Sequence, residues 1–138
     1  MLRALRRILK PLRHWKELPL RELTDRPATS AAPPARIPPI VVQTWEDRRF
    51  GKTHLREMAR FRELNPELSF ELWDREQRLA YLRTNWGHHP IHEIYEKALF
   101  GPMKADIFRY CLMADRGGFY FDISKGCSAP LRSLYSAE

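Results

Sequence analysis

The sequence has few cysteines and no long apolar run. Its 138 residues include two cysteines, Cys111 and Cys127, and two lone thiols make neither a disulfide framework nor a zinc site. No uninterrupted run of about 18 apolar residues is present, which is the length that a helix needs to cross a bilayer. The N-terminus also lacks the apolar core and the small-residue cleavage site of a secretory signal. We therefore expect a cytoplasmic protein.

The composition is that of a folded, basic protein. Hydrophobic residues make up 43% of the chain and aromatic residues 12%, which favours a globular domain over a disordered chain. Lysine and arginine number 24 against 17 acidic residues, giving a net charge of +7. This charge fits an anionic membrane, a phosphorylated ligand or nucleic acid. We expect no nucleic acid partner, because no recognition module is present and many of the basic residues lie in the first 26 positions.

The first sixteen residues form a basic segment. Leucines and Trp15 recur at roughly helical intervals, with arginine and lysine between them. This pattern is typical of an amphipathic helix, interrupted at Pro11, that lies on an anionic membrane surface. A solvated tail is the alternative interpretation, because runs of charge are usually exposed. The first interpretation predicts a peripheral protein at the inner face of a membrane.

A proline-rich stretch follows the basic segment. Six prolines lie between residues 19 and 39, and proline can neither continue a helix nor donate to a strand ladder. We therefore predict that residues 1–36 consist of the basic segment and a linker, and that the folded domain begins near Ile37 and continues to residue 138.

From Ile37 onward, strand and helix patterns alternate. Short apolar or alternating runs predict strands at residues 40–42, 68–72 and 119–121. Apolar residues at helical spacing predict helices at residues 53–64, 77–82, 90–99 and 103–114. This alternation predicts an α/β fold with helices on the faces of a sheet.

The stretch from residue 104 to residue 127 contains the strongest candidate site. Asp122 follows the aromatic run of residues 119–121, and ligands of open α/β folds bind at the carboxyl ends of strands. Asp106 and Arg109 are three residues apart on the preceding helix, hence on one face. Gly117 and Gly118 end that helix and allow a tight return to the strand. Two acids and an arginine could therefore share one pocket, although a local helical ion pair would also explain Asp106 and Arg109.

These residues also carry a family resemblance. Residues 105–110 and 117–122 resemble the signature of sugar transferases with an Asp-X-Asp motif, of the capsular polysaccharide and mannosyltransferase group (glycosyltransferase family 32). The large clostridial glucosylating toxins are more distant relatives. Residues 37–45 resemble the opening strand of this group, and residues 65–74 resemble the segment after it. The resemblance implies a GT-A-like nucleotide-binding sheet, of which we expect a chain of this length to hold only a part.

The family implies transfer of a hexose from a nucleotide diphosphate sugar to a saccharide or lipid-linked acceptor. It implies donor contacts from Asp106, Arg109, Tyr120 and Asp122. The first predicted strand ends in two polar residues and an indole, Gln43, Thr44 and Trp45. A nucleotide base could lie at this end of the strand. Packing of the domain edge is an equal alternative for the indole.

The family also implies a divalent cation, Mn²⁺ or Mg²⁺, held by the two acids of the motif. Asp122 matches the first acid, but Ser124 stands where the second is expected. A hydroxyl is a weaker ligand than a carboxylate for these ions. The alternative function is a truncated, non-catalytic nucleotide-sugar-binding domain, because 138 residues are few for a complete transferase and no catalytic base can be named.

Overall fold

The computed structural model describes residues 19–33 and 35–135. A three-stranded parallel sheet lies at the centre, in the order β4-β2-β5. Its strands are β2 (Ile40–Thr44), β4 (Ser69–Trp73) and β5 (Phe119–Tyr120). The fold is therefore α/β, as predicted, and it is compatible with part of a GT-A-like domain. The basic segment Met1 to Lys16 lies outside the described residues.

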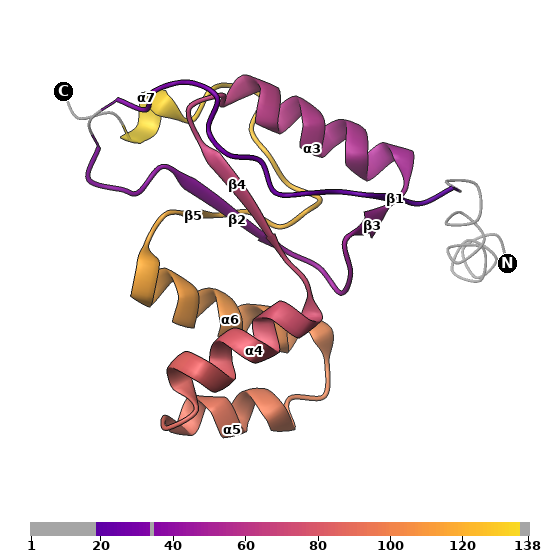
Figure 1. Ribbon diagram of the computed structural model, residues 1–138, viewed down its shortest axis with the longest axis vertical. Coiled ribbons are helices and arrows are strands. Elements are labelled where there is room, and N and C mark those ends of the chain that lie inside the picture. Colours follow the sequence, from indigo (N-terminus) through magenta and orange to yellow (C-terminus); the bar gives the residue numbers. More distant parts are fainter. Residues whose placement is uncertain (1–18, 34, 136–138) are drawn as a thin grey trace, which may run out of the picture.

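Helices cover both faces of this sheet (Figure 1). One face carries α3 (Lys52–Leu64), with the short α7 (Arg132–Tyr135) near its end. The other face carries α4 (Arg75–Trp86), α5 (Pro90–Lys97) and α6 (Gly101–Arg116). Among the described residues, none of the helices combines the length and the apolarity that crossing a membrane requires.

The buried strand β2 divides the core in two. Val41 packs with Phe61 and Phe70 on the α3 side, whereas Val42 packs with Leu82 and Phe108 on the α4–α6 side. Neighbouring residues face opposite ways because side chains alternate along a strand. The same alternation decides where the polar residues at the end of β2 point.

Two glycines make the return from α6 to β5. Gly117 and Gly118 have φ values of 65° and 96°, a region that residues with a Cβ rarely occupy. A Cβ on Gly118 would lie 2.8 Å from the carbonyl oxygen of Ile40. Glycine is therefore needed for β5 to lie against β2, and the predicted helix stop is confirmed.

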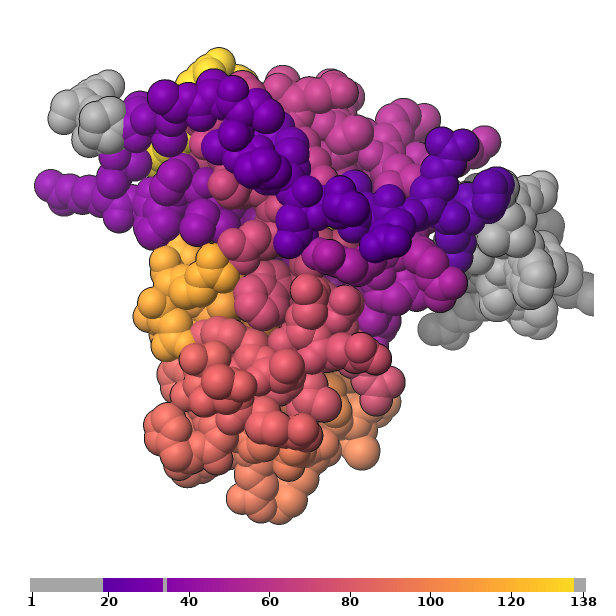
Figure 2. All heavy atoms as spheres, viewed as in Figure 1, coloured from indigo at the N-terminus to yellow at the C-terminus, as the bar shows by residue number. Residues whose placement is uncertain are grey.

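The proline-rich stretch differs from the predicted linker. Within it, β1 (Arg21–Glu22) pairs antiparallel with β3 (Arg49–Phe50). The Arg26 guanidinium lies over the Phe70 ring, 4.8 Å from its centre, and donates to the carbonyl oxygens of Arg62, Asn65 and Leu68 at 2.7 to 2.8 Å. Residues 21–30, which were predicted to belong to the linker, are therefore held by long-range contacts to β3, β4 and the end of α3. Figure 2 shows it (indigo) lying across the surface beside α3.

Candidate functional site

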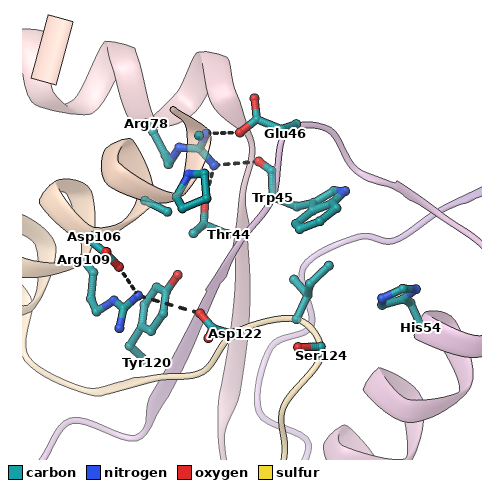
Figure 3. A pocket seen from close by; sticks show the side chains of 14 residues that line it. Thr44, Trp45, Glu46, His54, Arg78, Asp106, Arg109, Tyr120, Asp122 and Ser124 are labelled. Atoms are coloured by element: carbon teal, nitrogen blue, oxygen red, sulfur yellow. Dashed lines mark hydrogen bonds and ion pairs between the residues drawn. The ribbon is translucent and has the colours of Figure 1, made fainter. Parts of the chain in front are cut away.

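A pocket of about 600 Å³ opens at the carboxyl ends of β2 and β5 (Figure 3). The start of α6 and the buried face of α4 complete it. All of the predicted contact residues except Gln43 line this pocket. The lining consists of Thr44, Trp45, Glu46, His54, Arg78, Gly101, Pro102, Ala105, Asp106, Arg109, Tyr120, Asp122, Ile123 and Ser124.

Arg109 is the centre of one wall of the pocket. Its guanidinium donates to the Asp106 carboxylate at 2.5 Å and lies 3.8 Å from the Asp122 carboxylate. It also lies over the Tyr120 ring, 4.2 Å from the ring centre. The helix face and the glycine return thus bring together the two acids and the arginine. More than half of each carboxylate side chain is exposed, so both can still bind a ligand.

Tyr120 is held in its protonated form. Burial raises the pKa of its phenol to about 12, although the charge of Arg109 partly opposes this shift. At neutral pH the hydroxyl is therefore a hydrogen-bond donor in the pocket. Its ring gives Arg109 a flat surface on which to lie, which favours one orientation of the guanidinium.

The opposite wall depends on Arg78, a residue that the sequence analysis missed. Its side chain is only 1% exposed. It bonds to the hydroxyl of Thr44, to the carbonyl oxygen of Trp45 at 2.7 Å and to the Glu46 carboxylate at 3.0 Å. The available signal was its position four residues before Leu82, which places a charge on the buried face of a helix. Glu46 and His54, two further lining residues, carried no such signal.

Gln43 is not part of the pocket. It is 1% exposed, and its position in β2 directs it to the α3 side, away from Thr44. Its amide nitrogen has no hydrogen-bond partner among the described residues. Gln43 was predicted as a donor contact, but the structure does not bring it together with Thr44 and Trp45, because side chains alternate along β2.

The predicted metal ligands fit a cation that arrives together with a phosphate ligand. Asp122 and Ser124 both line the pocket, and a carboxylate with a hydroxyl offers oxygen ligands but only one negative charge. Within residues 19–33 and 35–135, no group of three or more His, Cys, Asp or Glu side chains could hold an ion. Mg²⁺ commonly binds through one or two carboxylates together with substrate phosphates and water. Asp122 and Ser124 suit this mode better than a preformed cage.

A parallel sheet with a pocket at the carboxyl ends of its strands is the arrangement in which open α/β proteins bind their ligands. Residues 51–138 match the model of the family described as a glycosyltransferase sugar-binding region containing a DXD motif. The chain belongs to this family.

The curated relatives include several yeast mannosyltransferases. Inositol phosphoceramide mannosyltransferase 2 of Schizosaccharomyces pombe is 28% identical over 134 residues, covering 96% of this chain and 38% of the relative. The initiation-specific alpha-1,6-mannosyltransferase of the same yeast is 30% identical over 103 residues, and the match covers 72% of this chain and 25% of that relative. A mannosyl phosphorylinositol ceramide synthase of Saccharomyces cerevisiae is 23% identical, and the match covers 75% of this chain and 27% of that relative. The match thus spans well under half of each relative. No solved structure matches the chain significantly.

Proposed function

We propose that this protein binds a nucleotide diphosphate sugar in the pocket and transfers its hexose to a saccharide or lipid-linked acceptor. The observation that carries the proposal is the meeting of Asp106, Arg109 and Asp122 in one pocket, in a member of the DXD glycosyltransferase family. Trp45 on the opposite wall supports it, because this residue is 44% exposed and an accessible indole offers a flat surface for a nucleotide base.

The pocket residues have complementary roles in this proposal. The leaving group is a nucleoside diphosphate, so transfer requires positive charge where negative charge develops. Arg109 supplies that charge to the phosphates, while Asp106 accepts hydrogen bonds from sugar hydroxyls. Tyr120 holds the Arg109 guanidinium in place, and Thr44 and Trp45 bind the nucleoside. These contacts fix the donor in a reactive position, which lowers the entropic part of the barrier.

A divalent cation would be held by Asp122 and Ser124. When bound, it would neutralise charge on the departing diphosphate. The single carboxylate predicts weak affinity in the absence of nucleotide, because each additional carboxylate contributes a charge that the Ser124 hydroxyl lacks.

The acceptor is proposed from the relatives. Two of them have ceramide in their names, which favours a lipid-linked acceptor over a soluble capsular or glycan saccharide. The basic segment Met1 to Lys16 would then bind anionic lipid at the cytoplasmic face of a membrane. Deleting this segment should abolish co-sedimentation with anionic vesicles, and raised salt should weaken it. Undiminished binding after the deletion would refute the lipid role.

A release assay tests the proposal. The chain is incubated with uridine or guanosine diphosphate sugars, with and without Mn²⁺, and free nucleoside diphosphate is measured in the presence of lipid-linked or soluble saccharide acceptors. Release that depends on an acceptor supports transfer. Binding without release under any condition would favour the non-catalytic alternative, and absence of binding would refute the proposal.

A further inference from the structure

We propose that Arg78 is a positioning residue that holds the segment Thr44–Trp45–Glu46 so that the Trp45 indole faces the donor. The inference rests on the proposed function, because it takes Trp45 to be a donor contact. Figure 3 shows Arg78 reaching from α4 toward this segment, with the Trp45 ring on the side of the segment where His54 lies, and Trp45 is one of the residues that line the pocket.

A single guanidinium bonds to three consecutive residues. One terminal nitrogen of Arg78 donates to the Thr44 hydroxyl and to the Trp45 carbonyl oxygen at 2.7 Å, and the other donates to Glu46 at 3.0 Å. The planar, rigid arrangement of these donors fixes the relative positions of their acceptors. The hydrogen bond from Arg78 of α4 therefore fixes the direction of the Trp45 carbonyl group.

Little else holds Trp45. Its backbone N–H donates to the Trp73 carbonyl oxygen at 3.2 Å, but the residue as a whole is 44% exposed. A side chain that is not enclosed by its neighbours takes its direction mainly from the backbone. The bond from Arg78 to the Trp45 carbonyl oxygen therefore fixes the backbone from which the indole projects.

Glu46 extends the same network to α6. It is the one carboxylate paired with Arg78 among the described residues, and a Cβ on Gly101 would lie only 3.0 Å from its oxygen. The first turn of α6, which leads to Asp106, therefore lies against the residue that Arg78 holds. A buried cation is costly unless it is paired and hydrogen-bonded, and Glu46 together with the oxygens of Thr44 and Trp45 meets this requirement.

A double-mutant cycle separates positioning from general support of the fold. Donor affinity is measured by isothermal titration for the wild type, Arg78→Met, Trp45→Ala and the double variant. Each single change should weaken binding about tenfold, since stacking on an aromatic side chain is worth ~1–3 kcal/mol. The loss in the double variant should be smaller than the sum of the two single losses, because Arg78 acts in large part through the indole. Additive losses, or no loss in Arg78→Met, would overturn the proposal.

Two further variants keep the test decisive. Arg116→Met removes another paired arginine, outside the pocket, and should leave donor affinity unchanged. Arg78→Lys keeps the buried charge but not the planar donors, and it replaces Arg78→Met in the cycle if the methionine variant fails to fold. Its loss of donor affinity should then be non-additive with that of Trp45→Ala. Full donor affinity in Arg78→Lys would show that Arg78 contributes only its charge, which would overturn the positioning role. A wild type that binds no nucleotide sugar would refute the proposed function, whereas binding with additive losses would refute only the role of Arg78.

Discussion

Replacing Arg109 with alanine separates a ligand-binding arginine from a structural one. In the structure its partners are exposed: the Asp106 pair is a helical i,i+3 contact, and Asp122 lies 3.8 Å away. Such pairs contribute about 0.5 kcal/mol or less, and the contact with the Tyr120 ring adds roughly 0.5–1 kcal/mol. The free energy of unfolding should therefore fall by only about 1 kcal/mol, measured by chemical denaturation.

Donor binding should suffer more than stability. A hydrogen bond to a charged group is worth about 1.5–3 kcal/mol, so Arg109→Ala should weaken nucleotide-sugar affinity by roughly 10- to 150-fold. Isothermal titration measures this loss directly. Arg116→Ala is the matched control, because Arg116 lies on the same helix and pairs with Glu71 outside the pocket. Unchanged donor affinity in Arg109→Ala would assign Asp106 and Arg109 to the scaffold.

Three further predictions concern the metal, the acid stability and the glycine return. Asp122→Asn should abolish nucleotide-dependent Mn²⁺ binding and Ser124→Asp should strengthen it, as measured by titration; unchanged metal affinity in both would exclude these ligands. Arg116 holds the pKa of Glu71 below its ordinary value of 4.5, so the pair stabilises the fold above that pH and loses its effect as pH falls through the lowered pKa. Arg116→Met should thus lower the free energy of unfolding by about 1 kcal/mol at pH 7 and by less at acid pH, as measured by chemical denaturation at both pH values. A loss of stability that does not change with pH would contradict this. Gly118→Ala should destabilise by at least ~1 kcal/mol, because a Cβ there would lie 2.8 Å from a backbone oxygen of β2; unaltered thermal unfolding would refute this reasoning.

The sequence was most informative where neighbours along the chain become neighbours in space. Asp106 and Arg109 share a helix turn, and two glycines return the chain to Asp122, so local geometry was sufficient to predict that the three residues would meet. The capping of α4 is equally local: Asp74 and Gln77 form reciprocal hydrogen bonds at its start.

The residues that were missed depend on distant contacts. Arg78 bonds to residues 32 to 34 positions away, and Arg26 to residues 36 to 42 positions away. Neither partner set is visible in a local pattern. Gln43 lies outside the pocket for a different reason: the strand was predicted over residues 40–42, whereas it continues through Thr44, and its side chains alternate between the two faces of the sheet.

The central claim is that the pocket binds a nucleotide diphosphate sugar through Arg109 and Asp122. Isothermal titration of the 138-residue chain with uridine and guanosine diphosphate sugars, in the presence of Mn²⁺, tests it most directly when an Arg109→Ala, Asp122→Asn double variant is titrated beside it. The account predicts that at least one donor binds the wild type and that this binding is lost in the folded double variant. Equal affinity in the two proteins, or no binding of any donor to the wild type, would contradict it.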